Sequence, residues 1–178
     1  MTILNRNNQS GRSMIEMLGV LAIIGVLSVG GIAGYSKAMA KYKLTRAQDQ
    51  ITMLLMNIRT AFASSASYSG LSTASAISWN LAPNDMYVSS GTTMHSAFGG
   101  GVTVSSTSGG LHFTIAMTGL SSDACRSLAT SDWGADGLVS IKLGSGANET
   151  FTAVSGQLPI PMSQATACTN GTITWEYY

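Results

Sequence analysis

Two hydrophobic patterns follow one another along the first part of the chain. Residues 17–36 carry no charge and are apolar on every side of a helix, whereas a core helix of a soluble domain shows one polar face. A helix of this length spans about 30 Å, the hydrocarbon thickness of a bilayer. Residues 37–66 lack Gly and Pro, and their apolar positions recur at spacings of three, four and seven. These positions are Leu44, Ala47, Ile51, Leu54, Ile58 and Phe62. Together the patterns predict one helix over residues 12–66, transmembrane over 17–36 and amphipathic afterwards.

The C-terminal part of the chain shows strand patterns. Apolar and polar residues alternate in two segments, which is typical of half-buried strands, and shorter apolar runs lie between turn residues. We expect strands at 102–104, 111–117, 138–143, 151–154 and 172–178. Residues 119–128 predict a short helix with Ser121 or Ser122 as its N-cap. Residues 67–91 are expected to form a long connecting loop.

These elements predict an α+β architecture. The amphipathic half of the long helix is expected to pack on an antiparallel sheet of four or five strands. The expected organisation is a leader peptide at residues 1–11, the helix at 12–66 with its transmembrane segment at 17–36, and a globular head at 67–178.

Charge is sparse and uneven along the chain. Charged residues make up 10% of it and the net charge is +1, which argues against nucleic-acid binding. Residues 1–59 hold seven of the nine basic residues and two acids, whereas residues 60–178 hold the other two basic residues and six acids. A chain this poor in charge and rich in Gly, Ser, Thr and Ala suits an exported protein that packs against copies of itself.

A basic run follows the apolar segment and consists of Lys37, Lys41, Lys43 and Arg46. One interpretation is that this run meets the acidic head of a neighbouring subunit, and the other is that it forms a solvated charged face. The head acids for such a contact are Asp85, Asp123, Asp132 and Asp136.

Both cysteines, Cys125 and Cys168, lie in the C-terminal half. An even number beyond a membrane segment is typical of one disulfide in an oxidising compartment, and two reduced buried thiols are the alternative. Closing this loop would stabilise the fold by about 4 kcal/mol in the chain-entropy model. No metal site is expected, because the chain has no CxxC pair and His95 and His112 are far apart in sequence. No catalytic motif or phosphate-binding loop is present either, so neither an enzyme nor a cofactor is expected.

The residues ahead of the apolar run carry a candidate maturation site. A secretory signal peptide is cleaved after its apolar run, where this chain offers nothing suitable. A cut between Gly11 and Arg12 instead leaves the apolar helix on the mature protein, with Glu16 close behind the new amino terminus. An ionisable side chain at the edge of a membrane helix is usually functional. The alternative is that Glu16 is a solvated acid among lipid headgroups.

Two segments of the chain resemble type IV pilins. The N-terminal signature of that family closely resembles residues 11–39, GRSMIEMLGVLAIIGVLSVGGIAGYSKAM, with Glu16 as the fifth residue after the Gly11–Arg12 bond. The type IVb subgroup has a Gly-Leu-(polar)-Cys-x-x-Leu segment that resembles residues 118–129, TGLSSDACRSLA. In type IVb pilins this cysteine pairs with one near the C-terminus.

The resemblance implies a prepilin that is held in the inner membrane and cleaved after Gly11 by a prepilin peptidase. It implies methylation of the new amino terminus at Arg12, and pairing of that amino group with the Glu16 carboxylate of an adjacent subunit. Pilus assembly machinery would then polymerise the subunit through its N-terminal helix. The product is a homopolymeric fibre on the cell surface that serves adhesion, aggregation or conjugative contact.

Other functions stay open at this point. Within the same class, the chain could be a minor pilin or a pseudopilin of a type II secretion system, rather than a major pilin. In a different class, it could be a membrane-tethered binding protein that does not polymerise. A tethered hydrolase has the least support, because the motifs of hydrolases are missing.

Overall fold

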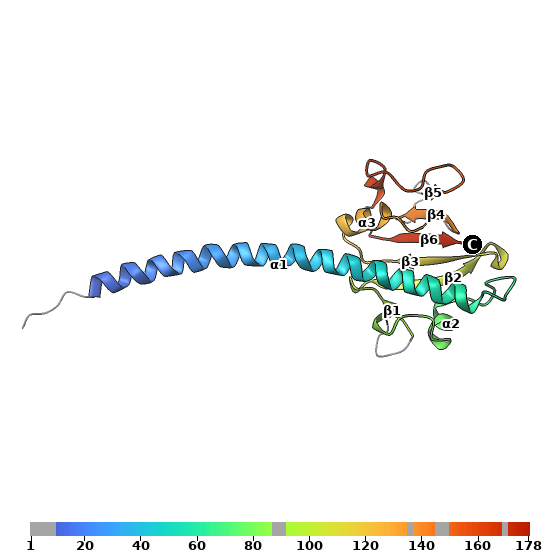
Figure 1. The fold of residues 1–178 in the computed structure, drawn as a ribbon, viewed down its shortest axis with the longest axis horizontal. Coiled ribbons are helices and arrows are strands. Elements are labelled where there is room, and N and C mark those ends of the chain that lie inside the picture. The colour runs from blue at the N-terminus through green and yellow to red at the C-terminus, as the bar shows by residue number, and fades with distance from the viewer. Residues whose placement is uncertain (1–9, 87–91, 135–136, 145–149, 169–170) are drawn as a thin grey trace, which may run out of the picture. The chain divides into compact units, whose positions relative to one another are not determined.

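The computed structural model describes residues 10–86, 92–134, 137–144, 150–168 and 171–178. Contacts within the chain divide it into two compact units, Met1–Lys41 and Tyr42–Tyr178. Helix α1 (Ser10–Ala61) supplies the described residues of the first unit and opens the second (Figure 1). The expected leader at 1–11 lies outside the described residues except for Ser10 and Gly11, which belong to α1.

Helix α1 ends earlier than the sequence pattern suggests. Its last residue is Ala61 instead of about Ala66, and residues 62–64 form turns. The residues beyond Phe62 are rich in Ser, whose hydroxyl competes for backbone hydrogen bonds and weakens a helix. Phe62, the last position of the helical periodicity, therefore lies one residue beyond the end of the helix.

Among the described residues, six strands form one antiparallel sheet in the order β1–β2–β3–β6–β4–β5. The strands are β1 (Met94–His95), β2 (Gly101–Thr107), β3 (His112–Met117), β4 (Leu138–Leu143), β5 (Thr150–Thr152) and β6 (Ile173–Tyr177). The five expected strands are all present, and the sixth, β1, was missed because two residues show no alternation. Strand β6 lies between β3 and β4, so Trp175 faces Ile115 on one side and Ile141 on the other.

The expected loop at 67–91 contains helical structure and is a correction to the sequence-based prediction. Helix α2 (Thr73–Ser78) begins with a capping box, in which the Ser72 and Ser75 side chains each accept from the other residue's backbone N–H. The turn η1 (Asn84–Met86) follows, and residues 87–91 lie outside the described residues. The capping box uses Ser in place of the usual Glu, which is why the composition of this segment resembles a loop.

Three further short helical elements complete the head. Helix α3 (Ser122–Ala129) has Ser121 as its N-cap, as one of the two expected choices, and the turns are η2 (Ser108–Gly110) and η3 (Ala165–Ala167). The predicted α+β architecture, with a long helix, an antiparallel sheet and one disulfide, is confirmed.

The core of the head lies between the sheet and the second half of α1, which runs along the sheet in Figure 1. The expected apolar face of α1 is confirmed, since Ala47, Ile51, Leu54 and Ile58 are fully buried and Leu44 and Phe62 are partly buried. Trp175 on β6 is fully buried in the same core, and Trp133 packs edge-on against Trp175 with ring centroids 4.7 Å apart.

Candidate assembly surfaces

The first half of α1 exposes apolar side chains on all sides. Every large hydrophobic residue from Met14 to Tyr35 is more than half exposed. Among the described residues, Met14–Ala61 is the one helix long and apolar enough to cross a membrane, and its most apolar window has no buried residue. Apolar surface of this extent is unfavourable in water and requires lipid or protein around it.

The predicted maturation residues share this helix. Gly11 and Arg12 lie in its first turn, and Glu16 lies one turn after Arg12 with an exposed side chain. The helix begins at Ser10, ahead of the expected cleavage bond, because no Pro interrupts the chain there and a single Gly costs only about 1 kcal/mol of helix propensity. Cleavage, methylation and the pairing of Glu16 stay predictions.

The two cysteines form the expected disulfide. Cys125 on α3 is bonded to Cys168, which follows η3, with the two Cα atoms 5.7 Å apart. Both residues are buried, at 0% and 2% exposure. The bond ties the long segment between β5 and β6, in whose described residues η3 is the one helical element, to a helix of the core.

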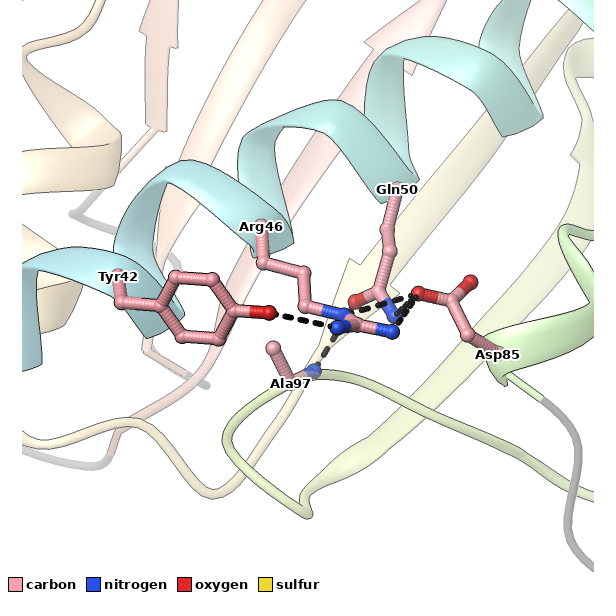
Figure 2. Close-up of polar contacts among 5 residues, drawn as sticks. All are labelled: Tyr42, Arg46, Gln50, Asp85 and Ala97. Atoms are coloured by element: carbon pink, nitrogen blue, oxygen red, sulfur yellow. Dashed lines mark hydrogen bonds and ion pairs between the residues drawn. The ribbon is translucent and has the colours of Figure 1, made fainter. Parts of the chain in front are cut away.

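A polar network joins the second half of α1 to the segment after α2 (Figure 2). The Arg46 guanidinium approaches Asp85 Oδ2 through both Nε, at 3.1 Å, and Nη2, at 3.0 Å, and its Nη1 donates to the Tyr42 hydroxyl at 2.8 Å. The hydrogen bond that Arg46 donates to Tyr42, followed by the one that it donates to Asp85, raises the pKa of Arg46, so this guanidinium stays charged. The network uses Arg46 and Asp85 within one chain, so both already have a partner there, and contact of the basic run with a neighbouring subunit stays a prediction.

Gln50 completes this network from the buried side of α1. Its Nε2 donates to Asp85 Oδ2 at 2.9 Å, and its Oε1 accepts from the backbone N–H of Ala97 at 3.0 Å. Gln50 is 3% exposed, so both ends of its amide are satisfied inside the protein. The sequence contained a signal for this residue, because position 50 follows Ala47 at a spacing of three on the apolar face.

A second polar cluster lies on the outer face of the sheet and does not have the geometry of a nucleophilic site. His112 Nδ1 lies 3.0 Å from Glu176 Oε1, and the Ser140 hydroxyl donates to Glu176 Oε2 at 2.9 Å. Glu176 therefore lies between Ser140 and His112, so no Ser–His hydrogen bond is available to activate the hydroxyl. Within the described part of the chain, no three His, Cys, Asp or Glu side chains are grouped closely enough to hold a metal ion.

Burial and a neighbouring charge shift the pKa of Tyr177, at the end of β6, in opposite directions. Its ring is fully buried, and its hydroxyl has no hydrogen-bond partner among the described residues. Burial raises the pKa of Tyr177, and the Arg59 guanidinium, 5.4 Å from the ring centroid, lowers it by a smaller amount.

The other head acids expected to meet a neighbour are exposed or not described. The Asp123 side chain is 95% exposed on α3, Asp132 is exposed after it, and Asp136 lies outside the described residues. Both described acids have a partner within the chain, since Asp123 Oδ1 lies 3.9 Å from Arg126 Nη1 and Asp132 Oδ1 accepts from the backbone N–H of Gly134 at 2.9 Å.

A comparison with known protein families matches most of this chain. The family model described as PilS N terminal matches residues 41–177, which is most of the chain and contains the whole head except its last residue. No curated protein matches this chain.

Proposed function

Because the chain belongs to the PilS N-terminal family, a family of pilin-like proteins, we propose that it is the structural subunit of a type IV pilus of the type IVb kind. The observation that carries this proposal is the first half of α1. It is apolar on all sides and wholly exposed, yet it is continuous with a folded, disulfide-bonded head. A subunit that is stored in a membrane and then packed among sister helices gives this helix apolar surroundings at both stages.

Cleavage after Gly11 supplies a switch from storage to assembly. Before cleavage the nitrogen of Arg12 is an uncharged amide, and afterwards it is an α-ammonium group. The Glu16 carboxylate of an adjacent subunit then has a cation to pair with in surroundings from which neighbouring helices exclude water. Such a pair is much stronger there than in water, and an unpaired carboxylate there is costly. Methylation of the Arg12 amino group keeps its positive charge.

The disulfide of the head agrees with an exported fibre. A disulfide is typical of proteins beyond the cytoplasm, and a prepilin would present its head on that side of the inner membrane. The partners are then the membrane, a prepilin peptidase, the pilus assembly machinery and other copies of the chain, with no nucleic acid and no enzymatic activity. The assembled fibre on the cell surface serves adhesion, aggregation or conjugative contact.

The proposal is tested with two variants at one position. Glu16→Gln keeps the shape of the side chain and removes its charge, and Glu16→Asp keeps the charge. We expect E16Q to abolish filaments in the sheared surface fraction while the protein is still inserted in the membrane, and E16D to retain part of the yield. Mass spectrometry of the mature chain should place a methylated Arg12 at its amino terminus. Normal filaments from membrane-inserted E16Q would refute the pairing.

The amount of this protein in the sheared surface fraction distinguishes a major pilin from the alternative functions. A major pilin dominates the sheared surface fraction, and deleting it removes the filaments seen by electron microscopy. A minor pilin or a pseudopilin would be scarce in that fraction. A tethered binding protein would remain with the membrane, and its deletion would leave the filaments intact.

A further inference from the structure

The outward face of α1 in the head exposes apolar side chains to water and carries few charged residues. Its exposed positions are Tyr42, Thr45, Arg46, Asp49, Thr52, Met53, Met56, Thr60 and Ala61. Three of these are large hydrophobic residues, since Tyr42 is 54%, Met53 55% and Met56 62% exposed. Surface helices of soluble proteins usually carry several charged residues on this face, and here there are only Arg46 and Asp49.

A groove of about 330 Å³ runs between this face and the segment that ends in η1. Tyr42 and Met53 from α1 and Pro83 from that segment supply its apolar walls. Arg46, Gln50 and Asp85, the network of Figure 2, also line it, and Asp49 provides the second carboxylate. The groove therefore combines an apolar surface with polar groups at defined positions.

The two carboxylates of the groove differ in their partners. Asp85 already interacts with a cation and a buried amide, through Arg46 and Gln50. Asp49 is exposed and has no hydrogen bond or ion pair with any residue that the structure describes. Because Arg46 is neutralised by Asp85, Asp49 is left as the uncompensated charge of the groove. The groove thus favours a cation with an apolar stem, which is the chemistry of a lysine side chain.

The chain itself contains a lysine of the required kind. Lys37 is the first charged residue after the apolar run, and its side chain is exposed. The other basic residues of this run are less available: Arg46 is bound to Asp85, Lys43 is half-buried, and Lys41 already has an interaction within its own chain. Copies that associate through residues 17–36 bring their α1 helices alongside one another. Because Lys37 and Asp49 are separated by about 18 Å along α1, an axial offset of this size between two copies brings the lysine of one level with the groove of the next.

We propose that the groove between α1 and Pro83 receives the Lys37 side chain of a second copy of this chain. The ammonium group pairs with Asp49, and the methylene groups pack against Tyr42 and Met53. This inference rests on the proposed function, because it names one contact between subunits of the fibre. It also replaces the general expectation of a basic stem against an acidic head with one lysine and one acid.

A reciprocal charge swap tests the pair. We expect D49K and K37E each to lower filament yield in the sheared fraction about tenfold, which is the lower end of the coupling energies measured for close charge pairs at an interface. The double variant D49K/K37E should recover most of the yield, because it restores opposite charges with their positions exchanged. D123K is the matched control, because the Asp123 side chain is 95% exposed on another surface, and it should leave the yield unchanged.

Each outcome has one interpretation. Unchanged yield in D49K, failure of the double variant to recover, or an equal loss in D123K would overturn the Lys37–Asp49 pair. Asp49→Asn serves as a second variant with little risk to folding, and it should lower the yield in the same direction. If wild-type chain gives filaments that E16Q abolishes while D49K and D49N have no effect, only this inference fails. If wild-type chain gives no filaments, the proposed function itself fails.

Discussion

Removal of the Cys125–Cys168 disulfide gives the sharpest test of how the head is stabilised. The bond joins α3 to the segment after η3, and it closes a loop with a sequence separation of 43 residues. In the chain-entropy model a loop of this size stabilises the folded state by about 4 kcal/mol, because the cross-link removes conformations from the unfolded chain. Between β5 and β6 the described residues contain one helical element, η3, and apart from Cys168 the core buries only Ile160 and Ala165 from this segment.

The perturbation is made in two ways. Reduction of the wild-type chain removes the covalent bond and leaves the same side chains, whereas Cys125→Ala together with Cys168→Ala also removes both buried sulfur atoms. We expect each to lower the midpoint of thermal unfolding in detergent by about 10–20 °C, since a head of this size loses several degrees per kcal/mol. The double variant should then be insensitive to reductant, which controls for side effects of the reducing agent.

Hydrogen exchange locates the effect in the structure. Amide protons in the segment 153–168 should lose protection first, and those of β3 and β6 should stay protected, because the sheet core does not depend on the bond. An unfolding midpoint that moves by less than about 2 °C on reduction would refute the reasoning, since it would mean that the loop is held by other contacts. Loss of protection across the whole sheet would contradict the local role of the bond.

Three further predictions concern the core and the polar network. Trp175→Ala should cost about 3–5 kcal/mol of unfolding free energy in denaturant titrations, whereas Trp79→Ala, at a position that is 50% exposed, should cost far less. Burial raises the pKa of Tyr177 above the value of about 10 expected in the unfolded chain, so the unfolded state loses this proton first as pH rises. Stability should therefore fall above about pH 10 by up to about 1.4 kcal/mol per pH unit, and Tyr177→Phe should remove this part of the fall without destabilising the fold at pH 7. Asp85→Asn should cost about 1 kcal/mol or less, because it keeps an acceptor for the Gln50 amide, whereas Asp85→Ala should cost about 1–3 kcal/mol more; equal costs would contradict the role of that hydrogen bond.

Elements with a long local pattern were predictable from the sequence. The buried face of α1 follows a helical period, and β3 and β6 fall within one residue of their expected ranges because alternation defines their two faces. The order of strands was not predictable in the same way. Strand β6 is the last in the chain and lies in the middle of the sheet, which depends on contacts between residues far apart in sequence.

The short elements β1 and α2 were not predicted, because no local sequence pattern marks them. Strand β1 has two residues and exists only because β2 pairs with it, so no local pattern marks it. Helix α2 begins with a capping box in which Ser75 takes the role of the usual Glu, and its small polar residues are equally common in loops. In both cases tertiary contacts, rather than local preference, decide the structure.

The pairing of Arg46 with Asp85 is the finding that most changes how the charges of this chain are understood. The sequence shows a basic run and an acidic head, and charge counting alone treats every member as available for contacts between subunits. The fold uses one residue from each group to fasten the segment after α2 to α1, with a buried glutamine as the third member. What remains on this face is a single unpartnered acid, Asp49, among exposed apolar side chains, and an exposed lysine, Lys37, elsewhere on the same chain. A fibre built from such subunits would depend on a few defined charge pairs together with apolar contact, so high salt should weaken it partly and not dissolve it.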